Sequence, residues 1–253
     1  MTNPVFFAEP SEFDGVAPGA LFVLTGAEAR HAVAVKRLAA GEAVDIVDGT
    51  GKRLSGTVTA VAPQELTVRA ESVAVDPAPP YSLTLVQALA KGDRDEMAIE
   101  AATELGVDRV VPWQSERSIV RWRDAKAAKG QAKWEATVRA AAKQSRRAVI
   151  PEVGTLVGLK DLCRLIASSR VALILHEDAA RSLADAVAEA GLPSDGDGSV
   201  LMIVGPEGGM SPQEVEQMLA AGAVAVRLGP HVLRSSTAGP AAVTLLSVQL
   251  RRW

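Results

Sequence analysis

Two stretches rich in glycine and proline near the C-terminus have the residue types that bind a small polar ligand. The first is Gly205-Pro206-Glu207-Gly208-Gly209, and the second runs from Leu228-Gly229-Pro230 to Arg234. Each follows a β-branched segment that predicts a strand, and each leads into a segment that predicts a helix. Glycine lets the backbone approach a ligand closely, and the amides that begin a helix attract anionic groups. We therefore expect the two connections to lie side by side and to form a pocket lined by backbone groups.

The helix between these stretches has a well-defined start. Ser211 is a typical N-cap residue, Pro212 stands at the first helical position, and Glu214 completes a capping box three residues after the serine. Gly222 is expected to end the helix. Its N-terminus would point back toward the glycines and offer amide donors to a ligand.

A strongly basic segment lies between Arg117 and Arg147. It holds ten lysines and arginines and only Asp124 and Glu135 as acids, although the whole chain has a net charge of −3. A solvated helix surface would explain part of this pattern. So one-sided a segment favours contact with a polyanion such as a nucleic acid, because affinity for phosphates depends on local charge.

The composition argues against membrane, secreted and metal-binding classes of protein. We expect no transmembrane helix because no apolar run is long enough, and no signal peptide because Met1–Phe7 lacks a basic start and a long apolar stretch. The single cysteine, Cys163, cannot form an internal disulfide, and the three histidines show no metal-ligand spacing. These features predict a cytoplasmic protein without a metal site.

The pattern of elements divides the chain into two predicted domains, residues 1–73 and 81–253, joined by the stiff segment Asp76-Pro77-Ala78-Pro79-Pro80. Short strands and one helix at Ala27–Leu38 suggest a small β-barrel in the first domain; the strands are expected at residues 21–24, 42–47, 54–61 and 65–70. Strands alternate with helices in the second, which predicts an α/β domain with a parallel sheet; its strands are expected at residues 83–88, 109–113, 171–175, 200–204 and 223–228.

At the two glycine-rich stretches the chain resembles the SPOUT superfamily of methyltransferases. Within it, the chain is similar to the ribosomal RNA small subunit methyltransferase E family, which makes 3-methyluridine. The similarity covers nearly the whole chain and is supported by Lys91-Gly92-Asp93-Arg94 and Glu116-Arg117-Ser118. His31 with Val35-Lys36-Arg37-Leu38 fits the family's PUA-like RNA-binding barrel. The chain departs from the family at Ser235-Ser236, where Thr-Glu is common.

The resemblance implies an α/β fold with a SPOUT-type parallel sheet and a C-terminal trefoil knot, preceded by the PUA-like β-barrel. It implies a homodimer that uses S-adenosylmethionine to methylate N3 of a uridine in 16S ribosomal RNA of the small subunit. The cofactor contacts carried over by motif are Leu175, His176, Val204, Gly205, Pro206, Glu207, Gly208, Gly209, Leu228, Gly229, Val232, Leu233 and Arg234.

Two of these residues are candidates for catalysis. Arg234 could stabilise the negative charge that spreads onto the uracil oxygens when N3 loses its proton, although it could also serve as a salt-bridge partner or helix cap. Glu207 could act as the base, hold the cofactor or only shape its turn. The residues expected to contact RNA are His31, Lys36, Arg37, Arg117, Arg121, Arg123, Lys143, Arg146 and Arg147. Methylation of another position, such as a ribose 2′-hydroxyl, and a non-catalytic RNA-binding dimer remain as alternatives.

Overall fold

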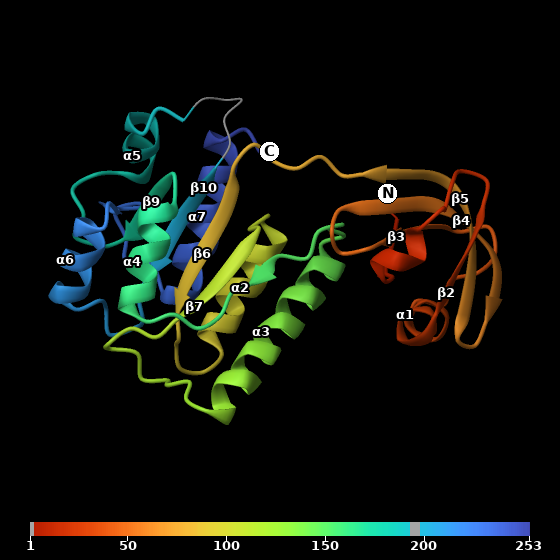
Figure 1. Cartoon of the computed structure of the whole chain (residues 1–253), viewed down its shortest axis with the longest axis horizontal. Coiled ribbons are helices and arrows are strands. Elements are labelled where there is room, and N and C mark those ends of the chain that lie inside the picture. The colour runs from red at the N-terminus through yellow and green to blue at the C-terminus, as the bar shows by residue number, and fades with distance from the viewer. Residues whose placement is uncertain (1–2, 193–197) are drawn as a thin grey trace. The chain divides into compact units, whose positions relative to one another are not determined.

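The computed structural model describes residues 3–192 and 198–253 (Figure 1). The chain forms two compact units. One comprises Met1–Ala78 with Ala142–Ile150, and the other comprises Pro79–Ala141 with Pro151–Trp253. The short segment Ala142–Ile150 thus belongs to the N-terminal unit. The predicted domains, residues 1–73 and 81–253, place this segment in the second domain instead. No described helix is both long and apolar enough to cross a membrane.

The N-terminal unit is a five-stranded sheet around one core. Its strands are β1 (Val5–Phe7), β2 (Leu21–Thr25), β3 (Ala43–Val47), β4 (Lys52–Ala62) and β5 (Glu65–Val75), in the order β1-β3-β4-β5-β2. β1 runs parallel to β3, and the other pairs are antiparallel. All five strands contribute buried side chains to one cluster, Phe6, Phe22, Ile46, Leu54 and Leu66 among them. The sequence predicts four of these strands; the three-residue β1 is too short to produce a periodic signal.

The predicted helix at Ala27–Leu38 is shorter and less regular in the structure. An α-helical turn, α1 (Gly26–Arg30), continues as a wider π-type turn over His31–Val35. Arg37 follows with a φ of +58°. The left-handed conformation costs a non-glycine residue roughly 1–2 kcal/mol, so a helix cannot continue through it.

Segment Ala142–Ile150 is fastened to this sheet by polar and apolar contacts. The Lys143 Nζ lies 2.7 Å from Glu28 Oε2 and 3.0 Å from His31 Nδ1, and the same Glu28 oxygen accepts the Phe7 N–H at 3.0 Å. The Ile150 N–H donates to the Gly49 carbonyl at 2.9 Å. These contacts explain why the segment groups with the N-terminal unit.

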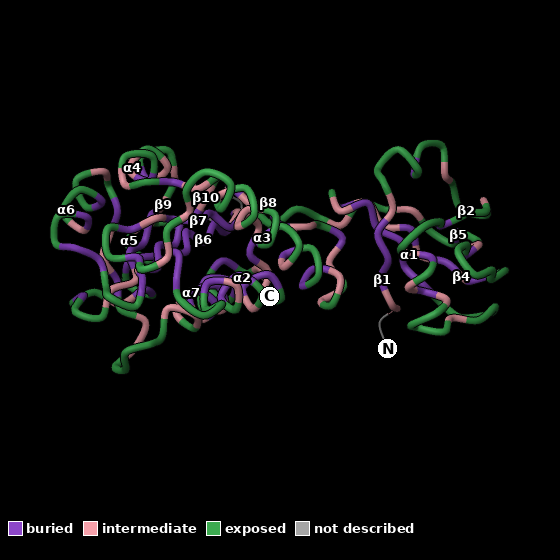
Figure 2. The backbone as a smooth tube through the Cα atoms, turned by 90° about the horizontal axis from the view of Figure 1, so that it is seen from below, coloured by how far each residue is buried: buried purple, intermediate pink, exposed green. Residues whose placement is uncertain are grey.

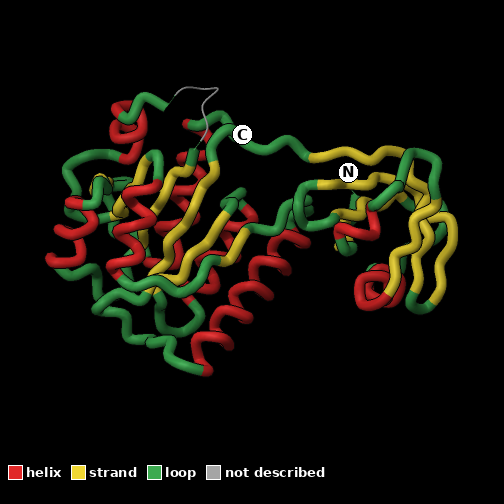
Figure 3. Tube along the Cα trace, viewed as in Figure 1, coloured by secondary structure: helices red, strands yellow, loops and turns green. Residues whose placement is uncertain are grey.

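The C-terminal unit has one six-stranded parallel sheet between helices (Figure 3). The strands, in the order β11-β9-β10-β6-β7-β8, are β6 (Ser82–Ala88), β7 (Arg109–Trp113), β8 (Glu152–Val153), β9 (Val171–Leu175), β10 (Ser199–Val204) and β11 (Val224–Val226). The helices are α2 (Arg94–Glu104), α3 (Ala125–Gln144), α4 (Leu159–Ser168), α5 (Leu183–Glu189), α6 (Pro212–Ala220) and α7 (Ser235–Gln249). The end of α3, from Ala142, belongs to the N-terminal unit. The predicted parallel α/β arrangement is confirmed.

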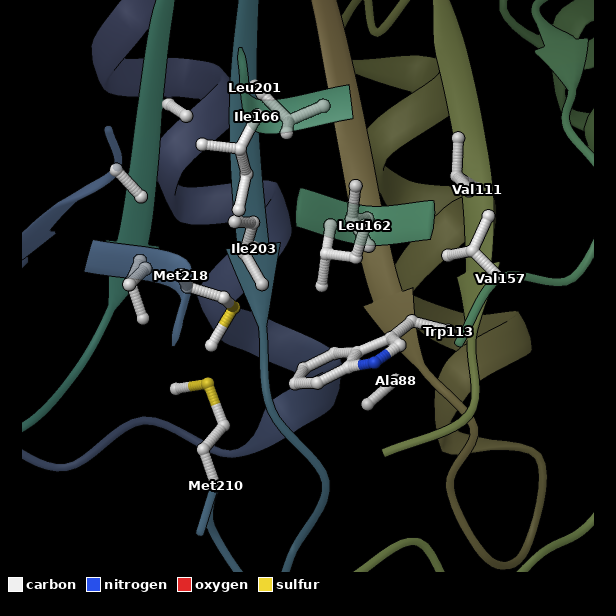
Figure 4. Close-up of a cluster of buried hydrophobic side chains, with 14 residues drawn as sticks. Ala88, Val111, Trp113, Val157, Leu162, Ile166, Leu201, Ile203, Met210 and Met218 are labelled. Atoms are coloured by element: carbon white, nitrogen blue, oxygen red, sulfur yellow. The ribbon is translucent and has the colours of Figure 1, made fainter. Parts of the chain in front are cut away.

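Two helices cover each face of the central strands. Helices α2 and α7 contact each other and pack on β6, and α7 also packs on β10. On the other face, Leu162 and Ile166 of α4 and Met218 of α6 join Trp113 and Ile203 in one buried cluster (Figure 4). The tube coloured by burial shows these central strands as the most buried part of the unit (Figure 2).

The strand order corrects the prediction that the two glycine-rich connections lie side by side. β10 and β11, which precede the two glycine-rich connections, are not neighbours, because β9 pairs with both of them. The connection that leaves β9 at His176 therefore lies between them. Sheet order depends on contacts between distant segments, so local sequence patterns do not determine it.

Candidate active site

The connection after β10 is fastened at its helical end by a buried carboxylate. Ser211 Oγ accepts the Glu214 N–H at 3.2 Å, and Glu214 Oε2 accepts the Ser211 N–H at 2.9 Å, which confirms the capping box. Glu214 is only 3% exposed and also accepts the Glu116 N–H at 2.7 Å and the Ser115 hydroxyl at 3.1 Å. One side chain thus joins the start of α6 to the connection that follows β7.

The glycines of this connection, which we call the cofactor loop (Gly205–Met210), are needed for its path. Gly209 has a φ of +70°, a conformation that other residues rarely adopt. A Cβ at Gly205 would lie 3.0 Å from Met210 Cγ, so a side chain there would crowd the core. The Arg117 guanidinium donates to the Gly208 carbonyl at 3.3 Å and holds the loop from the side of β7.

Glu207 is held by two donors that follow β6. Its Oε1 accepts the Lys91 N–H at 3.0 Å and a bond from Arg94 Nη1 at 2.9 Å. Burial alone would raise the pKa of this carboxyl, but hydrogen bonds from backbone amides and the Arg94 guanidinium outweigh it and lower the pKa below its ordinary value. Glu207 is therefore a carboxylate at neutral pH.

The ends of β9 and β11 supply the opposite wall. The His176 N–H donates to the Val226 carbonyl at 3.0 Å, and its Nδ1 accepts the Asp178 N–H at 3.2 Å. Because Nδ1 is an acceptor, a neutral His176 carries its proton on Nε2. These bonds fix the backbone and the imidazole at the mouth of the β9 connection.

Arg234 is the N-cap residue of α7. Its carbonyl accepts the N–H groups of Thr237 at 2.8 Å and Ala238 at 3.0 Å, while its side chain is exposed. The next residue, Ser235, has a buried Oγ without a hydrogen-bond partner in the described part of the chain. A guanidinium and an unpaired hydroxyl thus stand together where the helix amides begin.

These elements enclose a cavity of about 760 Å³, within the range of small-molecule sites. It is lined by most of the predicted cofactor residues: Leu175, His176, Val204, Gly205, Pro206, Glu207, Gly208, Gly209, Val232, Leu233 and Arg234. Leu228 lines an adjoining cavity of about 90 Å³ that shares Leu175, His176 and Val232. Gly229 lines neither cavity.

The cavity also has lining residues that the sequence analysis did not assign to it. These are Arg94, Arg117, Glu177, Asp178, Met210, Ser235 and Ala238. Glu177 and Asp178 directly follow His176, so their position after a predicted strand is a signal that could have found them. Arg94 belongs to the stretch Lys91-Gly92-Asp93-Arg94 that supports the family resemblance, but nothing local in that stretch indicates its bond to Glu207.

The residues predicted to contact RNA fall into two groups. His31, Lys36, Arg37, Lys143, Arg146 and Arg147 belong to the N-terminal unit, and Arg117, Arg121 and Arg123 belong to the connection after β7 in the C-terminal unit. Arg117 lines the cavity. Burial, and then the neighbouring Lys143 ammonium, lower the pKa of His31, so it is neutral at pH 7. Lys36, Arg37 and Arg123 are exposed.

Further ionisable groups lie at and beside the start of α2. Asp95 is 6% exposed, and its Oδ1 accepts the Glu96 N–H at 3.1 Å. Burial raises the pKa of Asp95 to about 6. Lys133 of α3 pairs with Glu96 at 2.6 Å and Asp93 at 3.2 Å. Within the described ranges, no cluster of three or more potential ligands could hold a metal ion.

Comparison with known proteins identifies the family. Residues 77–247 match the family described as RNA methyltransferase domain, and residues 24–71 match that described as RNA methyltransferase PUA domain. Ribosomal RNA small subunit methyltransferase E of Mycobacterium tuberculosis is 41% identical over 93% of this chain and 89% of its own length. The protein of the same name from Bacillus subtilis is 30% identical over 90% of each chain.

Two solved structures are similar to this chain over nearly its whole length. Ribosomal RNA small subunit methyltransferase E from Neisseria gonorrhoeae, bound to S-adenosyl methionine, has a TM-score of 0.81 at 28% identity and 98% coverage of both chains. A methyltransferase from Legionella pneumophila in complex with the cofactor SAM has a TM-score of 0.81 at 29% identity and the same coverage. The glycine-rich loops, the parallel sheet with its PUA-like partner and these relatives lead to one conclusion: the chain belongs to the ribosomal RNA small subunit methyltransferase E family.

Proposed function

We propose that this protein transfers a methyl group from S-adenosylmethionine to N3 of a uridine in 16S ribosomal RNA of the small subunit. The observation that carries the proposal is the cavity formed by the ends of β9, β10 and β11, with Arg234 at its edge. The identity of the cofactor is supported by the Neisseria relative, whose structure is bound to S-adenosyl methionine. A substrate in the small ribosomal subunit supports a cytoplasmic location for the proposed reaction.

The residues of the cavity fit this cofactor. A ligand with an adenine, a ribose and an amino acid needs a roomy site with many backbone donors and acceptors, and the cavity is about 760 Å³ and lined by glycine backbone. The unpaired Ser235 hydroxyl and the first amides of α7 add donors. Residues from the connections after β9, β10 and β11 would hold the cofactor. We propose the cavity-lining residues named above as its contacts.

Bound S-adenosylmethionine supplies an activated methyl group on a sulfonium. The chain must then hold the uracil with N3 facing that methyl and must favour loss of the N3 proton. As the proton passes to solvent water, negative charge spreads onto the two ring oxygens beside N3. The position of Arg234 in the cavity lining supports a role in stabilising this charge. One well-placed donor contributes about 3 kcal/mol to a transition state from which water is excluded.

Replacement of Arg234 tests this role. We expect Arg234→Ala to lower single-turnover methyl transfer to small-subunit ribosomal RNA by about 10²–10³-fold. The dissociation constant of S-adenosylmethionine, measured by calorimetry, should change by less than about threefold. An equal loss of transfer and cofactor affinity would assign Arg234 to binding or folding and would contradict the proposal.

RNA recognition is proposed for exposed cations in each unit. Lys36 and Arg37 suit phosphate contact because they are exposed. Lys143 and His31 are engaged with each other, and Lys143 is also engaged with Glu28, so we propose them as support for that surface. In the C-terminal unit, Arg121 and Arg123 are exposed in the connection that carries Arg117 to the cavity.

We also propose the finer features that the family implies. A trefoil knot is supported by the strand order, in which β9 separates β10 from β11, and by the return of α7 to β6 and β10. A homodimer is supported by exposed apolar side chains on α7 and before it, since Val232, Leu245 and Val248 are 73%, 41% and 61% exposed. Light scattering on the purified protein would show a monomer if the dimer is absent.

A further inference from the structure

Glu207 links two parts of the C-terminal unit that are far apart in the sequence. Its Oε1 accepts two bonds from the segment after β6, at 3.0 Å from the Lys91 amide and at 2.9 Å from Arg94 Nη1. The Glu207 side chain is 23% exposed and that of Arg94 is 44% exposed, so water screens the pair only in part. Both residues line the cavity.

The same contacts make Glu207 a poor proton acceptor. A general base works best when its pKa lies near the operating pH. Here Oε1 accepts bonds from two donors, one of them a cation, and this stabilises the carboxylate over its protonated form. These donors also lower the pKa of Glu207 against the effect of burial, which reduces its proton affinity further.

The bonds of Glu207 complete a set that holds the cofactor loop on both sides. Arg117 donates to the Gly208 carbonyl from the connection after β7, and Glu214 joins the start of α6 to the same connection. Arg94 and Lys91 hold the loop from the connection after β6. A glycine-rich loop has many accessible conformations, so fixing it before a ligand arrives lowers the entropic cost of binding.

We propose that Arg94 is a positioning residue of the cofactor site, which fixes Glu207 and through it the cofactor loop, and that Glu207 is an anchor and not the base. The inference rests on the proposed function, because the loop is taken to receive S-adenosylmethionine. Arg94 acts through Glu207 and needs no contact of its own with the ligand.

The anchor extends to α3. Lys133 pairs with Glu96 and Asp93, which flank Arg94 in the chain. Lys133 therefore helps to hold the start of α2, where Arg94 begins the helix. Because its ammonium is engaged in this way, Lys133 is assigned to the scaffold of the site.

Calorimetric titration of the full-length protein with S-adenosylmethionine tests the proposal. We expect Arg94→Met and Glu207→Ala each to raise the dissociation constant about tenfold, which corresponds to about 1.4 kcal/mol. If Arg94 acts through Glu207, Arg94→Met should have no further effect once Glu207 is alanine. Arg94→Lys should recover part of the affinity. Arg164→Gln serves as the matched control, because it also removes an arginine from an ion pair, the one with Asp161 on α4.

The base role is tested separately with Glu207→Gln, which keeps an oxygen for Lys91 and Arg94. We expect methyl transfer to fall by less than about tenfold, whereas loss of a general base costs about 10²–10⁴-fold. A loss in that range with normal cofactor affinity would overturn the anchor. Additive effects of Arg94→Met and Glu207→Ala, or no effect of Arg94→Met, would also overturn it. Failure of the unmodified protein to bind the cofactor would instead refute the proposed function.

Discussion

Replacement of Glu214 by glutamine should destabilise the C-terminal unit more than any exposed substitution on the same helix. The carboxylate is 3% exposed and accepts three bonds, from the Ser211 amide, the Glu116 amide and the Ser115 hydroxyl. All three donors depend on this one group. Glutamine has the same shape but only one accepting oxygen.

The magnitude follows from the two oxygens of Glu214. Oε2 serves Ser211 and Ser115, and Oε1 serves the Glu116 amide at 2.7 Å. In Glu214→Gln the NH₂ group must replace one oxygen, so at least one buried N–H faces another donor. A buried donor without a partner costs about 1–3 kcal/mol, and the bonds that remain lose their charge assistance. We expect a loss of about 3 kcal/mol, or a fall in Tm of roughly 6–12 °C for a unit of this size.

Tryptophan fluorescence during urea unfolding measures this loss selectively. Trp113, Trp122, Trp134 and Trp253, the four tryptophans of the chain, belong to the C-terminal unit. Glu216→Gln is the matched control, because Glu216 lies on the exposed face of α6. A loss of less than about 0.5 kcal/mol for Glu214→Gln, equal to that of the control, would refute the view that Glu214 fastens the cofactor loop.

Three further predictions concern other parts of the molecule. Burial raises the pKa of Asp95 from 3.8 to about 6, so the charged form of Asp95 destabilises the folded state. This destabilisation is absent below about pH 4 and complete above about pH 7. Asp95→Asn should therefore stabilise the C-terminal unit by up to about 3 kcal/mol at pH 8 and by little at pH 4, and an equal change in urea unfolding at both pH values would contradict this. A Cβ at Gly130 would collide with the Trp122 ring; Gly130→Ala should cost about 1–3 kcal/mol and alter near-ultraviolet circular dichroism, which an unchanged spectrum would disprove. Lys143→Met removes the bond to Glu28 and should destabilise the attachment of residues 142–150 by about 1–2 kcal/mol, seen as faster amide exchange there, whereas a residue that only contacts RNA would leave exchange unchanged.

Local signals in the sequence predict much of the fold. The capping box at Ser211 and Glu214, the parallel α/β pattern and most strands rest on short-range chemistry, and the structure contains them. β1 and β8 were missed, since strands of three and two residues show no period. The π-type turn at His31–Val35 was also missed, because helical periodicity does not distinguish it from an α-helix over five residues.

Long-range contacts explain what the sequence analysis could not determine. The glycines and Arg234 were found because ligand-binding loops carry local signatures, and they line one cavity. Arg94 was missed as part of the site because its partner Glu207 lies 113 residues away. Lys143 and His31 were predicted as separate RNA contacts, and only the fold brings both to one position beside Glu28.

Mass spectrometry of nucleosides from 16S ribosomal RNA tests the central claim most directly. The RNA would be purified from a strain that lacks this protein and from the same strain with the protein restored. We predict that 3-methyluridine is absent from the first and returns in the second, and that the purified protein restores it in vitro with S-adenosylmethionine. Persistence of 3-methyluridine in the deletion strain, or the appearance of a 2′-O-methylated nucleoside in its place, would contradict the account.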